Sequence, residues 1–345
     1  MDKTPIKVAT SIYGSIISWE YYRRELGLDL VLIDPQSLND FKSLGTPFVL
    51  ISNFEEWDYI FKNCPKQSLV VFATGNEYYD LQYFRKLDNY EAIRYAFVEY
   101  LPSVPSGNPL AYIYRFIFRD IRVILRKEFL FFLFRALRAY LGIKKLKLIT
   151  PHFLLPIGYT DRFFNELQKI ETTNSHDSLF SLKFGSQFNS RNITPFFAGQ
   201  KGSWLRRRTL SQFESRSASI TKYPVWGGNL SSENSSYAKS MYNSIFVVCP
   251  PGNRSNETNR YYESIICGAI PLISTRTISD FLCFQYWTEE SNFKNWTSLE
   301  IFDCLSKMPL VQLQELAKRI KVHENLKFRA LESRIRRIAA EITLN

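Results

Sequence analysis

The 345-residue chain has few cysteines, few glycines and no long apolar run. Its five cysteines are scattered and form no Cys-x-x-Cys pair, which argues against a zinc site and a disulfide framework and indicates reduced thiols. With 14 glycines and no sustained heptad pattern, collagen-like and coiled-coil architectures are excluded. No uncharged apolar stretch reaches the roughly 18 residues of a membrane span, so no transmembrane helix is expected.

The first ten residues also lack the apolar segment of a signal peptide, and we therefore expect a cytoplasmic protein. The composition is otherwise that of a globular protein, with 45% hydrophobic and 22% charged residues. A chain of this length has enough material for about two domains, each with its own core.

Positive charge is concentrated in one segment. The formal net charge is +11, and residues 115–147 hold ten Lys or Arg against two Asp or Glu, a difference of +8. Arg115, Arg119, Arg122 and Arg126 follow at steps of four, three and four, which places them on one stripe of an α-helix rich in Phe, Ile and Leu. A basic amphipathic helix in region 111–147 is typical of binding to an anionic membrane surface. The alternatives are a domain helix with solvated or ligand-bound arginines, and a nucleic-acid contact.

Short apolar runs alternate with polar, helix-capable segments along the chain. The runs lie at residues 6–11, 29–33, 47–52, 68–73 and 146–150 (ended by Pro151), and then at 195–199, 245–249 and 270–274. Helices are expected at residues 16–26, 204–215, 235–243, 258–267 and 311–342, the last broken around His323. Continuous apolar strands between helices predict parallel sheets covered on both faces. The sequence thus predicts an α/β fold of two Rossmann-like doubly wound domains, 1–190 and 191–345, joined near the polar stretch 171–194 and separated by a cleft.

The window 244–274 combines the residue types of a nucleotide diphosphate site. A buried strand ends in Pro250-Pro251-Gly252, and a helix begins near Thr258 after a polar loop. Ligands of open α/β sheets bind outside the carboxyl ends of strands and at helix N-termini. Arg260 can clamp a diphosphate, and Glu263 suits a ribose diol; an ordinary helix salt bridge between these two residues is the alternative. The other expected ligands of the diphosphate and nucleotide are Gly252, Asn253, Arg254, Ser255 and Thr258.

The second half of the chain resembles the exostosin-like glycosyltransferases. The residues that carry the resemblance are Cys249-Pro250-Pro251-Gly252, Arg260-Tyr261-Tyr262-Glu263-Ser264 and Gly268-Ala269-Ile270-Pro271-Leu272-Ile273, preceded by Phe196-Phe197-Ala198-Gly199-Gln200 and Arg207-Arg208-Thr209-Leu210. The similarity covers about residues 195–275. It implies a GT-B fold with the acceptor in the N-terminal domain and the nucleotide-sugar in the C-terminal one. By the same resemblance, Arg207 and Arg260 bind the donor diphosphate and Glu263 binds the ribose, while Arg254 replaces the family's basic residue at Pro251.

The resemblance implies an inverting glycosyltransferase that uses a nucleotide-sugar, with a UDP-sugar expected, and a glycan or lipid-linked glycan acceptor in bacterial surface polysaccharide synthesis. Such a transfer needs a general base, for which Glu77, Asp80 and His152 are the candidates. No Asp-x-Asp motif occurs, so transfer without a metal or other cofactor is expected, at the inner face of the cytoplasmic membrane. A non-catalytic GT-B-like binding or scaffold protein and a basic nucleic-acid-binding protein remain the alternatives.

Overall fold

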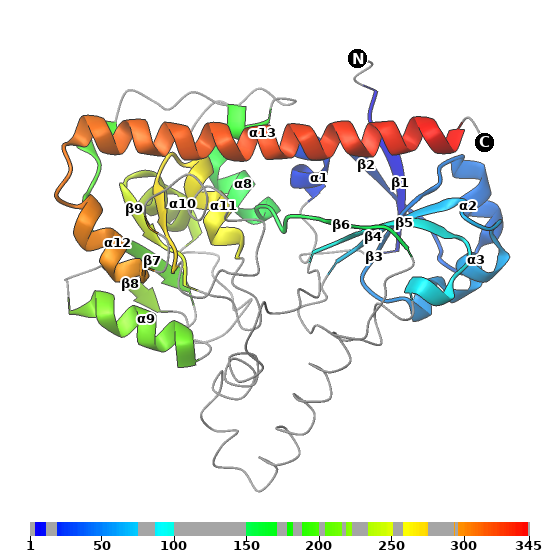
Figure 1. Ribbon diagram of the computed structural model, residues 1–345, viewed down its shortest axis with the longest axis horizontal. Helices are drawn as coiled ribbons and strands as arrows, with labels where there is room; N and C mark the ends of the chain where they lie inside the picture. Colours follow the sequence, from blue (N-terminus) through cyan, green and yellow to red (C-terminus); the bar gives the residue numbers. More distant parts are fainter. Residues whose placement is uncertain are drawn as a thin grey trace, which may run out of the picture. The chain divides into compact units, whose positions relative to one another are not determined.

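The computed structural model describes residues 4–11, 19–74, 87–99, 150–170, 178–181, 188–199, 204–215, 219–222, 234–250, 258–274, 293 and 296–343. These residues fall into two compact units (Figure 1). Unit 1 draws them from Met1–Val104, Arg138–Ile157 and Lys327–Asn345, and unit 2 draws them from Gly158–Leu326. Each unit is built on its own parallel sheet, which confirms the expected α/β fold with two doubly wound units.

Unit 1 contains a six-stranded sheet in the order β2-β1-β3-β4-β5-β6, in which every neighbouring pair is parallel. Its strands are β1 (Ile6–Thr10), β2 (Leu28–Leu32), β3 (Phe48–Ile51), β4 (Leu69–Ala73), β5 (Ile93–Val98) and β6 (His152–Leu154). The chain passes from β1 outward to β2 and then back past β1 to β3. The strand order therefore reverses between β1 and β3, where open α/β sheets place ligands beyond the carboxyl ends of the strands.

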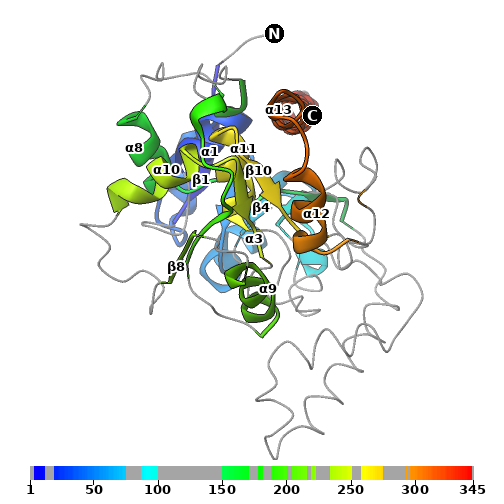
Figure 2. The ribbon, with the colours of Figure 1, turned by 90° about the vertical axis from the view of Figure 1, so that its left-hand side faces the viewer.

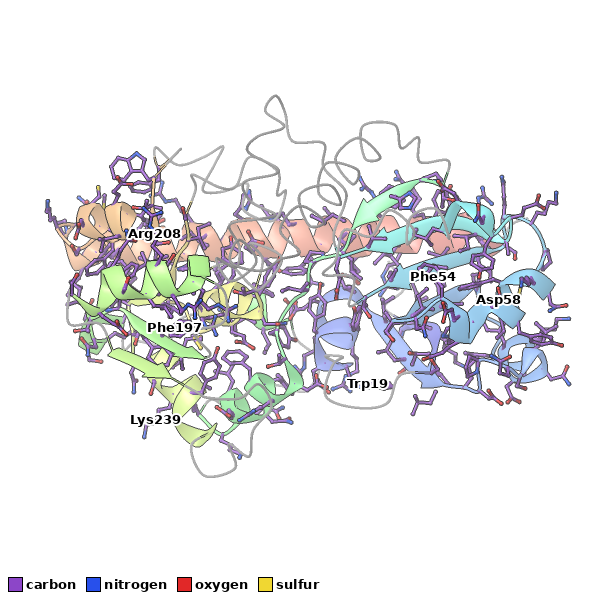
Figure 3. All side chains as sticks on the ribbon, turned by 90° about the horizontal axis from the view of Figure 1, so that it is seen from below. Trp19, Phe54, Asp58, Phe197, Arg208 and Lys239 are labelled. Carbon is purple, nitrogen blue, oxygen red and sulfur yellow. The ribbon has the colours of Figure 1, made fainter. Side chains whose placement is uncertain are left out.

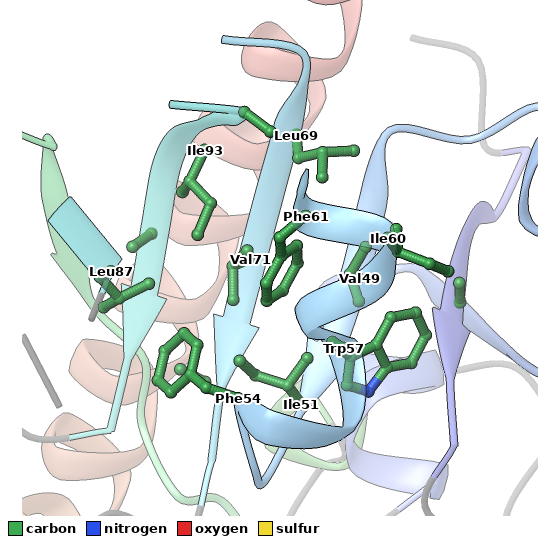
Figure 4. Close-up of a cluster of buried hydrophobic side chains, with 14 of the residues drawn as sticks. Val49, Ile51, Phe54, Trp57, Ile60, Phe61, Leu69, Val71, Leu87 and Ile93 are labelled. Carbon is green, nitrogen blue, oxygen red and sulfur yellow. The ribbon is translucent and has the colours of Figure 1, made fainter. Parts of the chain in front are cut away.

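Helices cover both faces of this sheet. Right-handed crossovers place α1 (Trp19–Leu26) on one face, and α2 (Leu38–Leu44) and α3 (Asp58–Asn63) on the other. Figure 4 shows the core under α3, where Trp57, Ile60 and Phe61 pack on Val49 and Val71 of the sheet. The 3₁₀ turn η1 (Glu55–Trp57) leads into α3.

Two residues with special backbone roles delimit α2. Ser37 has an extended backbone, and its hydroxyl accepts a hydrogen bond from the Asp40 N–H, so Ser37 is the N-cap of the helix. Gly45 ends the helix with φ of +64°, a conformation that glycine adopts without steric cost. These two residues explain the short length of α2.

Unit 2 contains a four-stranded parallel sheet in the order β10-β9-β7-β8. Its strands are β7 (Phe196–Gly199), β8 (Ser219–Lys222), β9 (Phe246–Val248) and β10 (Ile270–Leu272). Its helices are α8 (Asp161–Gln168), α9 (Trp204–Glu214), α10 (Asn234–Tyr242), α11 (Asn259–Ile266) and α12 (Ser298–Leu305), with the 3₁₀ turns η2 (Leu179–Ser181) and η3 (Phe188–Ser190). In this sheet the strand order reverses between β7 and β9.

The two faces of this second sheet are covered by different helices. Phe302 of α12 contacts Phe213 of α9 and Phe246 of β9. On the opposite face, Tyr237 of α10 contacts Phe196 of β7. Figure 2 shows α10 and α12 on the two sides of this sheet.

The last helix, α13 (Leu310–Thr343), is continuous through His323, so the expected break there is absent. Its residues 310–326 belong to unit 2 and its residues 327–343 to unit 1. Within unit 1, Phe328 packs edge-on against Tyr21, and Arg334 lies over the ring of Phe153. The second half of α13 thus completes the face of the first sheet that α2 and α3 leave uncovered.

Unit 2 begins at Gly158 and the chain returns to unit 1 at Lys327, whereas the sequence predicts a single domain boundary at residue 190. Residues 158–170 join unit 2 because the carboxylate of Glu166 accepts the N–H of Ala238, and Asn259 donates to the carbonyl of Gly158. The last strand of the first sheet begins at His152, where Ala96 of β5 pairs with it. Of the apolar run expected at 146–150, residues 146–149 lie outside the described residues.

Candidate functional site

The carboxyl end of β7 lies at the point where the strand order of unit 2 reverses, and the first turn of α11 approaches it. Thr258 is the N-cap of α11, with an extended backbone. The helix ends at Ile266, Cys267 is its C-cap, and Gly268 follows with φ of +72°. The expected helix at 258–267 and the strands on either side of it are confirmed to within two residues at each end.

Arg260 places its guanidinium at this strand end. Nη2 donates to the carbonyl oxygen of Ala198 at 2.8 Å, and Cζ lies 4.6 Å from the centre of the Phe197 ring. Phe196 and Phe197 are consecutive strand residues and point to opposite faces, Phe196 toward Tyr237 of α10. The Arg260 side chain therefore crosses the end of β7 from the α11 side to the ring of Phe197. Figure 3 labels Phe197 on the sheet and Arg208 on the neighbouring α9.

No described carboxylate neutralises the positive charge of the Arg260 guanidinium. Across the described part of the chain, Arg260 forms no ion pair, and its Nε is buried without a hydrogen-bond partner. The helix salt bridge with Glu263, considered as an alternative on the sequence, is not formed. Instead the arginine is oriented by a carbonyl oxygen and an aromatic face, neither of which neutralises it. Such a group is suited to binding an anion bidentately.

The N-terminus of α11 adds a second feature suited to an anion. Thr258 occupies the N-cap, but its hydroxyl makes no capping bond, and Oγ1 is buried without a partner among the residues that can be described. The backbone N–H groups of a first helical turn lack partners within the helix and carry partial positive charge. Arg260 lies in this same first turn, so a cation and a helix N-terminus are adjacent.

Glu263, the expected ribose ligand, is buried and uses both carboxylate oxygens within unit 2. Oε1 accepts from the backbone N–H and the hydroxyl of Thr160, at 3.3 and 2.9 Å. Oε2 accepts from the hydroxyl of Tyr237 at 2.7 Å. Neither Thr160 nor Tyr237 was singled out from the sequence, because no spacing rule links residue 160 or 237 to residue 263. The ribose assignment of Glu263 stays a prediction.

The remaining donor-site candidates divide into described and undescribed residues. Arg207 is exposed in the first helical turns of α9, the helix that follows β7. Gly252, Asn253, Arg254 and Ser255 lie outside the described residues, as do Arg115, Arg119, Arg122 and Arg126. Cys249, at the end of β9, is buried, and burial raises the pKa of its thiol to about 12, so it packs as a neutral side chain.

Of the three base candidates, only His152 can be placed, since Glu77 and Asp80 lie outside the described residues. His152 is half-buried at the start of β6, and its Nδ1 is hydrogen-bonded to the carbonyl of Thr150. Burial lowers the pKa of the imidazole, against smaller opposite effects of the hydrogen bond to the Thr150 carbonyl and of the charge of Asp88. The ring is therefore neutral near pH 7 and able to accept a proton.

The reversal point of the first sheet carries a hydrogen-bonded group that the sequence analysis did not identify. Trp57 Nε1 donates to the hydroxyl of Ser11 at 3.2 Å, and that hydroxyl donates to the carboxylate of Glu56 at 3.1 Å. Ser11 follows β1 directly, and Glu56 lies in the turn after β3. The signal available in the sequence was only their position after apolar runs, which many polar residues share.

Two kinds of feature are absent from the described residues. None of the helices there is both long enough and apolar enough to span a bilayer. No group of three or more His, Cys, Asp or Glu side chains in these ranges could hold a metal ion. The sequence expectation of transfer without a metal remains a prediction.

No protein-family model matches the chain, and no curated protein matches it in sequence. Among solved structures, the chain is similar to a crystal structure of an alpha1,3-fucosyltransferase, with a TM-score of 0.37 and 13% sequence identity. The similarity covers 95% of this chain and 81% of the fucosyltransferase chain.

Proposed function

We propose that this protein is a glycosyltransferase that moves a sugar from a nucleotide-sugar, a UDP-sugar, to a glycan or lipid-linked glycan. The observation that carries the proposal is the guanidinium of Arg260, fixed at the carboxyl end of β7 beside the point of strand reversal and unpaired with any described carboxylate. A nucleoside diphosphate that leaves a sugar is the kind of anion that such a group stabilises. The resemblance of residues 195–275 to exostosin-like enzymes supports the choice of ligand.

In this proposal Arg260 and Arg207 bind the diphosphate, and the N-terminus of α11 contributes Thr258 together with the preceding Gly252, Asn253, Arg254 and Ser255. A base removes the proton of the acceptor hydroxyl, and the oxygen attacks the anomeric carbon from the face opposite the diphosphate. The bond from that carbon to the diphosphate oxygen breaks, and the nucleoside diphosphate leaves as an anion. The configuration of the sugar is inverted, and the arginines and helix N-terminus stabilise the leaving charge without a metal.

The candidates for the base are Glu77, Asp80 and His152, as on the sequence. We add Glu56 as a candidate, because it lies after β3 at the reversal point of the first sheet and its side chain is exposed. A carboxylate already hydrogen-bonded by one hydroxyl has lone pairs left for the hydroxyl of a sugar.

We further propose that the enzyme acts at the inner face of the bacterial cytoplasmic membrane in surface polysaccharide synthesis. The support is the basic, Phe-rich segment 115–147 with its arginines Arg115, Arg119, Arg122 and Arg126. Binding to vesicles that contain an anionic lipid at low salt, and none to neutral vesicles, is the expected result. Indifference to both kinds of vesicle contradicts this part of the proposal.

The test of the donor site compares Arg260→Ala with Arg208→Ala, which removes an exposed charge from α9. Calorimetry with UDP, with and without EDTA, measures binding, and release of UDP from UDP-sugars measures turnover. Arg260→Ala is expected to weaken UDP binding about thirtyfold or more, since truncating a buried charge partner costs roughly 2 kcal/mol or more. Arg208→Ala and EDTA are expected to change little. Equal binding by Arg260→Ala and the native protein contradicts the proposal, and binding without turnover of any nucleotide-sugar indicates the non-catalytic alternative.

A further inference from the structure

Three helices of unit 2 meet at the carboxylate of Glu263. The side chain is 3% exposed and accepts three hydrogen bonds. Thr160 at the start of α8 donates two of them, and Tyr237 of α10 donates the third. Since Glu263 itself lies in α11, the three bonds join α8, α10 and α11 at one point.

Both partners of Glu263 are themselves fixed. The hydroxyl of Thr160 also accepts the N–H of Phe163 at 3.3 Å and thereby caps α8. The ring of Tyr237 contacts those of Phe163 and Phe196, with centroid distances of 6.4 and 6.2 Å. Burial, followed by the charge of Glu263, raises the pKa of the Tyr237 hydroxyl well above its ordinary value, so it stays a donor.

Glu263 lies one helical turn after Arg260, which reaches toward β7 instead. The rotation of α11 about its axis determines where the Arg260 guanidinium lies relative to the carbonyl of Ala198. A change in that rotation moves both side chains together, because they share one rigid helix. The bonds of Glu263 therefore fix the position of the cation.

We propose that Glu263, with Thr160 and Tyr237, is a positioning residue that holds α11 so that Arg260 meets the donor diphosphate, and that it makes no contact with the ribose. This inference rests on the proposed function, in which Arg260 binds that diphosphate. A ribose diol would need lone pairs of a carboxylate that is buried and already accepts three bonds. A positioning role leaves the three hydrogen bonds from Thr160 and Tyr237 to Glu263 in place.

Comparing ligands with and without a ribose tests the inference. Inorganic pyrophosphate and UDP are titrated into the native protein, Glu263→Gln and Tyr237→Phe, with thermal melting to confirm that each variant is folded. The matched controls are Asp58→Asn and Tyr90→Phe. Tyr90 donates to the carboxylate of Asp58 at 2.7 Å, a tyrosine–carboxylate pair of unit 1, whereas α11 lies in unit 2.

Both Glu263→Gln and Tyr237→Phe are expected to weaken pyrophosphate and UDP by the same factor, about tenfold, as indirect coupling through packed side chains does. In an Arg260→Lys background, Tyr237→Phe is expected to weaken the binding of both ligands by a smaller factor than it does in the native protein. If Tyr237 had only a general structural role, it would weaken binding by the same factor in both backgrounds. The control pair is expected to leave both affinities unchanged.

The inference is overturned if Glu263→Gln weakens UDP but not pyrophosphate, because that pattern identifies a ribose ligand. It is also overturned if Glu263→Gln and Tyr237→Phe are folded and bind both ligands as the native protein does. Failure of the native protein to bind either ligand is a different result, which removes the proposed function and this role with it.

Discussion

The guanidinium of Arg260 lies at the end of β7, where a side chain at position 199 would otherwise stand, and residue 199 is a glycine. A Cβ atom at residue 199 would lie 2.6 Å from Nη2 of Arg260, closer than a carbon and a nitrogen can approach. Gly199 also has φ of +147°, which residues with a side chain rarely adopt. The glycine is therefore a requirement for the observed position of the guanidinium.

We expect Gly199→Ala to displace Arg260 and to weaken the binding of inorganic pyrophosphate about tenfold, the effect of losing roughly 1.4 kcal/mol. Gly45→Ala is the matched control, because Gly45 also has a positive φ but has nothing within 4 Å of the added carbon. Both variants are expected to lose about 1 kcal/mol of stability from backbone strain. Calorimetry and urea unfolding give the two quantities, and an equal loss of pyrophosphate binding in both variants contradicts the argument.

Two threonine N-caps of unit 2 are expected to respond differently to removal of the hydroxyl. Thr297 accepts the N–H of Glu300, whose carboxylate accepts the N–H of Thr297 in return, so Thr297→Ala should cost about 1 kcal/mol of stability. Thr258→Ala should cost little or raise stability, because its hydroxyl is buried and unbonded in the described residues.

For the binding of UDP, we expect the larger effect from the variant that has the smaller effect on stability. Thr258→Ala should weaken UDP binding, and Thr297→Ala should not. Urea unfolding and calorimetry on both variants check the pairing. A large loss of stability in Thr258→Ala would show that its hydroxyl has a structural partner.

The stability of the protein should depend on pH through Glu166. Burial raises the pKa of this carboxyl above its ordinary value, and the carboxylate of Glu263 adds to the effect. As the pH rises from the ordinary pKa to the raised one, the unfolded chain ionises before the folded chain, so the free energy of unfolding falls. The Gln side chain cannot ionise but keeps an oxygen for the N–H of Ala238.

Glu166→Gln should therefore gain stability relative to the native protein as the pH rises from about 4 to about 7. Urea unfolding at the two pH values measures the gain. Glu315→Gln, an exposed position on α13, is the control and should show none. A constant difference between Glu166→Gln and the native protein at the two pH values would refute this account.

Glu56→Gln separates donor binding from transfer. If Glu56 accepts the proton of the acceptor hydroxyl, the variant should bind UDP as the native protein does and lose about a hundredfold or more in turnover, as is usual for a general base. Glu55→Gln, an exposed neighbour in the same turn, is the control. Full turnover by Glu56→Gln would leave the base among Glu77, Asp80 and His152.

The central strands of both sheets could be predicted from the sequence because they are continuously apolar. Residues 69–73 and 246–248 are buried on both faces and consist of Leu, Val, Phe and Ala. β5 and β8 were not predicted. In β5 the charged Arg94 interrupts the apolar residues near the start of the strand, and β8, Ser219–Lys222, has a single aliphatic residue, Ile220. Their strand state comes from pairing with β4 and β7, which residue order alone does not show.

Part of the candidate site could likewise be predicted from the sequence. Arg260, Glu263 and Thr258 were singled out because they follow an apolar strand in the order expected for a helix N-terminus. Their partners were not, since Thr160 lies 103 residues before Glu263, and Ala198 lies 62 residues before Arg260. A contact over such a separation depends on how the sheet orders its strands.

The division of α13 between the units has a consequence for synthesis on the ribosome. Residues 6–98, which supply the first five strands of unit 1, are made well before residues 327–343, which cover one face of that sheet. Until then the rings that contact Phe328 and Arg334 have no cover on that side. Unit 1 thus starts to form first and is completed last, and its nascent sheet must avoid aggregation while unit 2 is translated.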